Sequence, residues 1–95
     1  MDVIQSNNES LTYQTTIVDP TDALSSAIWA MIGTNASYKL SNQLDTSTTS
    51  QIMVSELIID QVYLLTCLAL CDSGAIYELD PPLRITCRDI QSNIG

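Results

Sequence analysis

Residues 52–71 read IMVSELIIDQVYLLTCLALC, a nearly continuous apolar run that contains neither glycine nor proline. Thr48 followed by Gln51 fits the capping box that opens many helices. The segment DSG at residues 72–74 supplies a stop signal after the run. The length of the uninterrupted run therefore favours one long helix over residues 49–71.

The same run leaves a second interpretation open, because many of its residues favour strands. These residues are Ile52, Val54, Ile58, Ile59, Val62 and Tyr63. Asp60-Gln61 would then form a turn between two strands. In that case residues 52–71 hold two strands in place of one helix.

A second helix is predicted over residues 20–32. Asp19 is an N-cap type that accepts a free amide hydrogen bond, and Pro20 loses no bond at the first helical position. Gly33 can end the helix in a left-handed conformation. The apolar face of this helix would consist of Leu24, Ile28 and Met31, with Trp29 and Ile32 beside them.

Three further segments alternate apolar and polar residues and are predicted to be strands, namely 11–18, 75–79 and 83–90. The segment Asp80-Pro81-Pro82 is expected to turn between the last two. Residues 34–50 are mostly Ser, Thr, Asn and Asp, which indicates a loop with room for a short edge strand near Tyr38.

The predicted organisation is one small α+β domain. Residues 1–10 are polar without periodicity and are expected to form a flexible N-terminal arm. Residues 11–95 are expected to form a single globular domain, with two helices packed on a small antiparallel sheet. We find no internal repeat at solenoid periods.

The charge of the chain restricts its partners. Eleven acids oppose three bases, Lys39, Arg84 and Arg88, and the net charge is −8. Nucleic acids and anionic lipid surfaces would be repelled, so we expect no direct nucleic-acid partner and favour a basic one. Glu56 and Asp60 also oppose a membrane span through the apolar run.

No catalytic residue, cofactor or metal site is expected. The chain contains no histidine, which removes the commonest general base and every Ser-His or Cys-His arrangement. Glu56 and Asp60 would share a helix face, as a polar stripe or as paired carboxylates. Cys67, Cys71 and Cys87 are too few for a tetrahedral zinc site and are expected to be buried thiols in a reducing, intracellular compartment.

A helix over 49–71 would be about 35 Å long and apolar on nearly every side, more than one small domain can cover. Full enclosure by the other elements is the alternative. We therefore predict an interface on this helix and its neighbour, in which Trp29 and Tyr63 are anchors. The predicted interface residues are Trp29, Leu57, Ile58, Tyr63, Leu64, Leu65 and Leu68.

These features predict a non-enzymatic protein–protein interaction subunit that self-associates or docks into a larger assembly. The compact chain, its low charge content and its lack of catalytic residue types resemble small accessory or virion proteins of viruses and phages in a general way. The small, odd number of cysteines predicts an intracellular, cytoplasmic location, and the resemblance implies a place in a virion as the alternative. The alternative function is an acidic inhibitor that binds a basic, nucleic-acid-binding protein by imitating phosphate charge.

Overall fold

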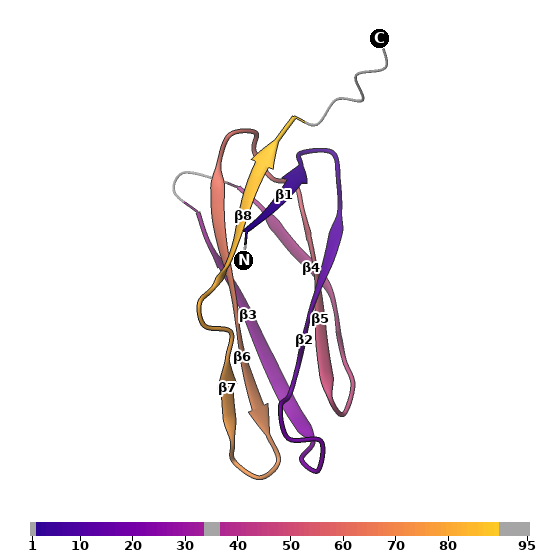
Figure 1. The fold of residues 1–95 in the computed structure, drawn as a ribbon. Coiled ribbons are helices and arrows are strands. Elements are labelled where there is room, and N and C mark those ends of the chain that lie inside the picture. The colour runs from indigo at the N-terminus through magenta and orange to yellow at the C-terminus, as the bar shows by residue number, and fades with distance from the viewer. Residues whose placement is uncertain (1, 34–36, 90–95) are drawn as a thin grey trace.

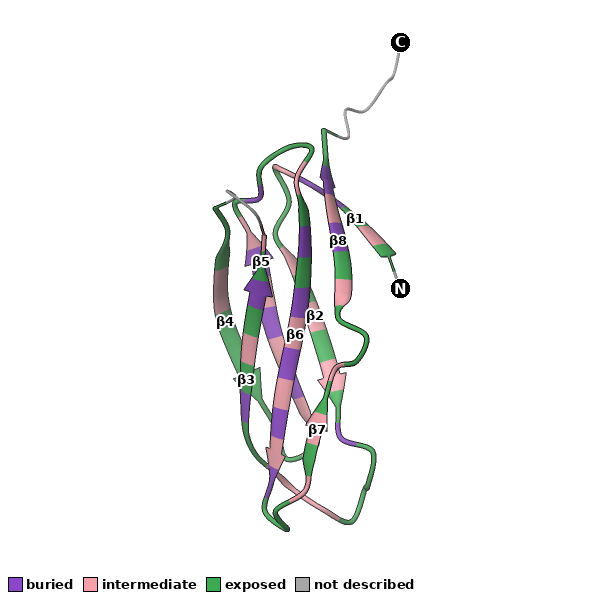
Figure 2. Ribbon diagram, turned by 90° about the vertical axis from the view of Figure 1, so that its left-hand side faces the viewer, coloured by how far each residue is buried: buried purple, intermediate pink, exposed green. Residues whose placement is uncertain are grey.

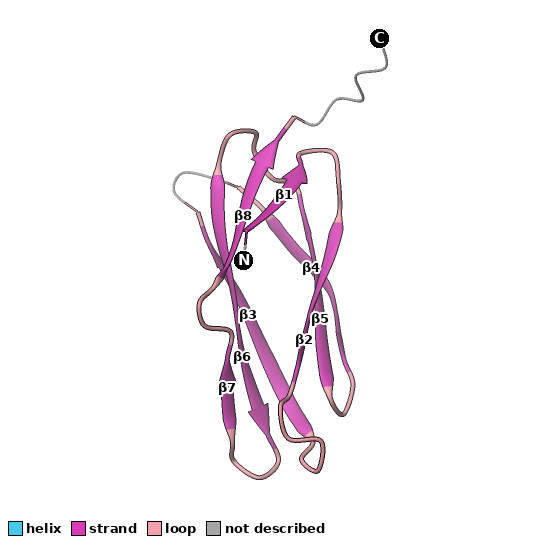
Figure 3. Cartoon of the chain, viewed as in Figure 1, coloured by secondary structure: helices cyan, strands magenta, loops and turns pink. Residues whose placement is uncertain are grey.

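The chain folds into two packed β-sheets. A computed structural model describes residues 2–33 and 37–89, and these residues form strands and connections without any helix (Figures 1 and 3). The strands are β1 (Asp2–Ser6), β2 (Leu11–Thr16), β3 (Leu24–Ile32), β4 (Lys39–Asp45), β5 (Thr49–Ser55), β6 (Val62–Cys71), β7 (Ile76–Glu78) and β8 (Leu83–Arg88). The predicted α+β fold with two helices is therefore wrong.

The two sheets differ in width. One holds five strands in the order β1-β8-β6-β3, with β7 also paired to β6, and the other holds three strands in the order β2-β5-β4. The pairing of β1 with β8 is parallel, and the other pairs are antiparallel. This strand order is similar to that of an immunoglobulin-type sandwich in which the first strand, β1, lies beside the last strand, β8. A fold of this kind supports many functions and specifies none.

The predicted helix over 49–71 is wrong, and the alternative of two strands is confirmed by β5 and β6. Residues 56–61 connect them, and Glu56 and Asp60 adopt positive φ angles of 60° and 66° there. Such angles are incompatible with a continuous right-handed helix. The run looked helical because β6 is apolar on both of its sides, which hides the alternation typical of a strand.

The predicted helix over 20–32 is also wrong, because its capping signal forms a turn. The carboxylate of Asp19 accepts hydrogen bonds from the backbone N–H (2.9 Å) and the hydroxyl (2.7 Å) of Thr21. The backbone N–H of Asp22 bonds back to the carbonyl of Asp19 at 3.2 Å. Aspartate makes such turns as readily as helix caps, and here strand β3 follows.

The remaining strand predictions agree with the structure at most positions. The segment 11–18 contains β2, and 75–79 and 83–90 contain β7 and β8, although residue 90 lies outside the described residues. The polar segment after residue 34 provides β4 at an edge of the three-stranded sheet. Residues 2–6, within the expected N-terminal arm, form β1 at an edge of the five-stranded sheet.

The core lies between the sheets and contains fully buried side chains from β5, β6 and β8, including Val54, Tyr63, Leu65 and Ile85. The Tyr63 hydroxyl accepts a hydrogen bond from the Ile58 backbone N–H (2.9 Å) and donates one to the Ser37 carbonyl (3.0 Å). A tyrosine at the start of this strand, bonded back to upstream backbone, is similar to the tyrosine corner of immunoglobulin-type sandwiches. It fixes the 56–61 connection against β6.

Polar side chains also join the two sheets. The indole N–H of Trp29 on β3 donates to the Ser50 hydroxyl on β5 at 2.8 Å, and Ser50 in turn donates to the carboxylate of Asp45. Gln5 on β1 is fully buried and donates to the Val54 carbonyl at 2.9 Å. These bonds satisfy buried polar groups and fix how the sheets stack.

Candidate functional site

The residues predicted to form an interface lie in two different environments. Leu57, Tyr63 and Leu65 are buried in the core. Trp29 points between the sheets, where its indole bonds to Ser50, so it and Tyr63 are structural anchors in the fold. The structure therefore places four of the predicted residues inside the sandwich.

The other three predicted residues face outward. Ile58 lies in the connection before β6 and is exposed, while Leu64 and Leu68 lie on the outer side of β6. Figure 2 shows how buried residues alternate with more accessible ones along β6. Alternate residues of a strand point to opposite faces, so neighbours in sequence are separated by the sheet.

Leu64 and Leu68 belong to an apolar surface on the outside of the five-stranded sheet. Leu68 is paired across the strands with Ile28, and Leu64 with Ile32. Ile28 is 56% exposed and Ile32 is 66% exposed. We call this surface the apolar face; it consists of Ile4, Ile28, Ile32, Val62, Leu64, Leu68, Leu70 and Ile76.

Sequence reasoning missed Ile4, Ile28, Ile32, Val62, Leu70 and Ile76 as members of this surface. Four of these residues, Ile28, Ile32, Val62 and Leu70, lie in the segments predicted to be helices. When such an apolar segment is interpreted as a strand, every second residue lies on the outer side of the sheet. Ile28 and Ile32 then lie on the side opposite the buried Ala27 and Met31. Only the strand interpretation brings these apolar side chains together on one face of a sheet.

The charges around the apolar face differ from those of the whole chain. Arg84 and Arg88, two of the three basic residues, lie on the outer side of β8. Arg84 is opposite Leu64 on β6 and Asp2 on β1. Of the eleven acids, all within the described ranges, only Asp2, Asp45 and Glu78 lie in strands. The acidity of the protein is therefore concentrated in the connections.

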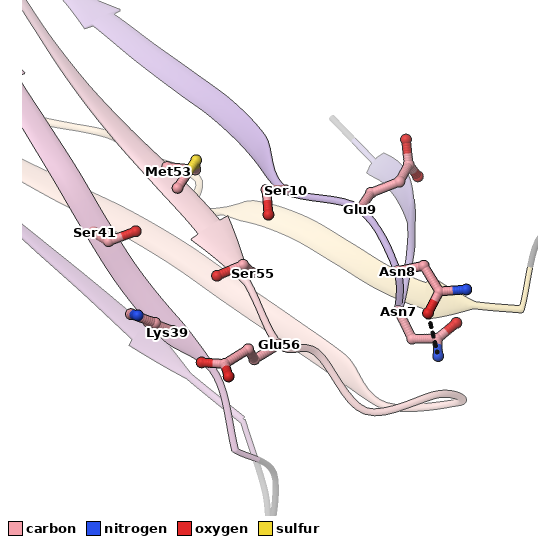
Figure 4. Close-up of a pocket in the computed structure, with 9 residues that line it drawn as sticks. All are labelled: Asn7, Asn8, Glu9, Ser10, Lys39, Ser41, Met53, Ser55 and Glu56. Atoms are coloured by element: carbon pink, nitrogen blue, oxygen red, sulfur yellow. Dashed lines mark hydrogen bonds between the residues drawn. The ribbon is translucent and has the colours of Figure 1, made fainter.

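A polar pocket of about 370 Å³ lies beside the connection between β1 and β2 (Figure 4). Its lining consists of Asn7, Asn8, Glu9, Ser10, Lys39, Ser41, Met53, Ser55 and Glu56. The charged residues Glu9, Lys39 and Glu56 are all exposed to solvent.

Asp60, which was expected to share a helix face with Glu56, instead forms an exposed ion pair with Arg88 at 3.3 Å. The two carboxylates thus have different surroundings.

The three thiols are free and buried. Cys67 and Cys71 are four residues apart on one strand, about 13 Å at the usual strand rise. Burial, with a smaller contribution from the Asp45 charge, raises the pKa of Cys67 to about 11. Burial likewise raises the pKa of Cys71 and Cys87. These thiols stay protonated at neutral pH and are poor nucleophiles.

Within residues 2–33 and 37–89, no group of three or more His, Cys, Asp or Glu side chains is arranged to hold a metal ion. The described part of the chain also contains no helix that is long and apolar enough to cross a membrane.

No protein-family model matches the chain, and no curated protein matches it. The apolar face is thus the surface feature on which a functional argument can rest.

Proposed function

We propose that this chain is a non-enzymatic protein–protein interaction subunit that self-associates through the apolar face. The observation that carries the proposal is the exposure of Ile28, Ile32 and Ile76, which are 56%, 66% and 62% exposed on one sheet face. These side chains point away from the core, so they are not needed to fill it. Contiguous apolar surfaces of this kind are typical of interaction sites.

Burial against a partner is the physical reason for association. Removing apolar surface from water contributes about 25 cal/mol per Å². The cross-strand pairs Ile28–Leu68 and Ile32–Leu64 lie on two adjacent strands of one sheet, with the pair Ala30–Thr66 between them. Such a surface can lie against a second sheet face, as the two sheets do within the sandwich itself. A partner would thus be packed by the same interactions as the core.

A second copy of the chain is the occupant that the charges favour. Copies with a net charge of −8 repel one another, and they approach with least repulsion through a surface that has few acids. Arg84 lies beside the apolar face, opposite Leu64, and forms no ion pair within the described residues, while Asp2 and Glu78 lie in strands of the same sheet. In a two-fold dimer each patch meets itself, so Arg84 of one copy can approach an acid of the other.

Light scattering after size-exclusion chromatography tests self-association. We expect a discrete oligomer that is insensitive to reductant, because all three thiols are buried and unpaired. Leu64→Glu should produce a folded monomer, since the new carboxylate lies opposite Arg84 and outside the core. Met53→Glu is the matched control, because it adds the same charge to the outer side of the other sheet and should leave the oligomer intact.

A monomeric wild-type protein at every concentration would overturn self-association and direct the search to a foreign partner. Dissociation by both substitutions would attribute the effect to added charge and not to the apolar face. Unfolding of the Leu64→Glu variant would instead mean that this side chain belongs to the core. Circular dichroism of each variant distinguishes these outcomes.

The reduced, buried thiols support an intracellular or virion setting for this subunit, since disulfides are the usual use of cysteine in oxidising compartments. The setting is part of the proposal. Expression in an oxidising and in a reducing compartment tests this setting. We expect folded protein with three free thiols from the reducing compartment and not from the oxidising compartment.

The second candidate is an acidic inhibitor of a basic protein. Asp19, Asp22 and Asp72 lie around one end of the sandwich, where the Asp22 carboxylate accepts a hydrogen bond from the Ser73 backbone N–H at 3.3 Å. This arrangement concentrates negative charge in two neighbouring turns. Binding of that kind should weaken steeply as salt rises, whereas association through the apolar face should not. Titration of the complex with sodium chloride therefore separates the two functions.

A further inference from the structure

Within residues 2–33 and 37–89, strand β2 has an unpaired edge. Its neighbour β5 lies on one side, and β2 is the last strand of its sheet. The Ile17 backbone N–H donates to the Thr48 carbonyl at 2.9 Å, which continues the register of this strand pair. Odd-numbered residues of β2 therefore bond to β5, and the N–H and C=O groups of Thr12, Gln14 and Thr16 point away from it.

Two other sheet edges in the described residues, those of β3 and β4, are protected. On β3, Gln43 Nε2 donates to the Ala27 carbonyl and the Tyr38 hydroxyl donates to the Met31 carbonyl, each at 2.9 Å. On β4 the pairing register shifts between Ser41 and Leu44, and Asn42 has a positive φ of 52°. Side-chain caps and bulges of this type prevent an edge from pairing with another strand.

The edge of β2 lacks both devices. Its six residues, LTYQTT, contain no charge and pair with β5 in an unbroken register. An uncharged, regular edge offers hydrogen bonds to an extended peptide. The backbone groups of Thr12, Gln14 and Thr16 thus define the chemistry of a binding partner as another strand.

An apolar groove of about 240 Å³ lies beside this edge. It is lined by Val3, Tyr13, Gln14, Trp29, Leu65, Leu79 and Leu83. Leu65 is fully buried, whereas Tyr13, Trp29 and Leu83 are only partly buried, so the core is open to solvent here. The volume is below the range of about 300–1,000 Å³ typical of small-molecule pockets and suits side chains.

The unequal widths of the sheets explain why the groove exists. The three-stranded sheet ends at β2, while the five-stranded sheet continues past β6 to β7, β8 and β1 (Figure 1). Leu79 and Leu83, around the turn between β7 and β8, line the groove on the wider sheet. A fourth strand beside β2 would extend the narrower sheet over them.

We propose that an extended peptide segment of a partner protein adds to β2 as a fourth strand and places an apolar side chain in this groove. The acids Glu9 and Asp19 precede and follow β2. The bound peptide segment therefore has an apolar centre, which fits the groove, and basic residues on both flanks, which face these acids. This site is separate from the apolar face, which lies on the outer side of the other sheet. The two sites can therefore be tested independently.

Selection from a display library of short random peptides, with the full chain as bait, tests the proposal. We expect enrichment of peptides that alternate apolar and polar residues between terminal lysines or arginines. Their affinity should fall at least about tenfold, or about 1.4 kcal/mol, in Gln14→Pro, which removes an outward N–H. Gln14→Ala is the matched comparison: it loses the same side chain from the groove and the same bond to Gln51 but keeps the N–H, so its affinity should fall less than that of Gln14→Pro.

Amide hydrogen exchange on the wild-type protein gives a second readout that does not depend on a proline variant. The amides of Thr12, Gln14 and Thr16 should exchange rapidly in the free chain and slowly with a selected peptide bound. Three results would overturn the proposal: no enriched peptide, unchanged exchange at these amides, or equal binding to the proline and alanine variants. Peptides that lose binding in Leu64→Glu alone would assign the selected site to the apolar face.

Discussion

The outer faces of the two sheets have opposite character. The outer side of the three-stranded sheet carries Thr12, Gln14 and Thr16 from β2, and Gln51 of β5 donates to the Gln14 side chain at 2.8 Å. The corresponding side of the five-stranded sheet carries the apolar face. Both faces belong to one short chain, so its composition does not explain the difference. Only the five-stranded sheet exposes a cluster of large apolar side chains on its outer side, and such a cluster calls for a covering partner.

The largest effect should come from a substitution on the inner side of β6, the strand in the middle of the apolar face. Leu65 is fully buried, and a carboxylate there would lose its hydration without a partner. We expect Leu65→Glu to cost at least about 4 kcal/mol and to unfold the protein. Circular dichroism checks this, and Leu64→Glu, one position away on the outer side, should keep the native spectrum. Two equally unfolded variants would remove the contrast between the sides of β6.

A smaller effect should follow when the apolar face is made to resemble the other outer face. The double substitution Ile28→Thr and Ile32→Thr retains β-branched side chains on β3 but adds hydroxyl groups. We expect a monomer at concentrations where the wild type is assembled, with little change in the unfolding midpoint of the chain itself. Sedimentation velocity measures the association, and an unchanged oligomer would locate the interface elsewhere.

The next effect concerns the corner that begins β6. Tyr63→Phe removes a hydroxyl that makes two hydrogen bonds and leaves the Ile58 N–H and the Ser37 carbonyl without it. We expect a loss of about 1–3 kcal/mol in the free energy of unfolding, measured by urea denaturation. Tyr38→Phe removes one bond from a more exposed ring and should cost less. The reverse order would mean that the corner does not hold the strand.

The smallest effect concerns the thiols on the inner side of the same strand. Burial raises the pKa of Cys67 to about 11, while the unfolded thiol titrates near 9.0. Deprotonation therefore favours the unfolded chain above pH 9.0, and stability should fall as pH rises toward 11. Urea denaturation at several pH values measures this, and Cys67→Ala should flatten the alkaline part of the profile. Alkylation of the native thiols at neutral pH would show that the inner side is open.

The contrast between the faces also explains which elements could be predicted. Strands β2 and β8 carry polar residues outside and apolar residues inside, so their period of two is visible in the sequence. Strands β3 and β6 are apolar on both sides, and their sequences resemble buried helices. Both sequences therefore predict helices, and for β3 the preceding Asp19-Pro20 capping signal adds to that prediction. The property that concealed these strands is the same one that forms the candidate interface.

The candidate site was only partly visible from the sequence for a related reason. A helix spacing groups Leu64, Leu65 and Leu68, whereas a strand separates Leu65 from the other two. Ile4 and Ile76 join the surface through pairing with β8 and β6, and such pairing depends on contacts between distant parts of the chain. No local pattern contains that information. The interface as a surface therefore becomes apparent only in the folded sheet.

The parallel pairing of β1 with β8 has a consequence for biosynthesis. During translation β1 leaves the ribosome first among the strands and β8 leaves it last, so β1 has no neighbour in its sheet until almost the whole described chain is synthesised. Contacts between such distant segments slow folding, because a long loop must close before they form. Residues 62–65 of the apolar strand β6 pair with β8, so they also lack this neighbour until β8 is synthesised, and a chaperone or a copy on the same polysome can reach them in that period.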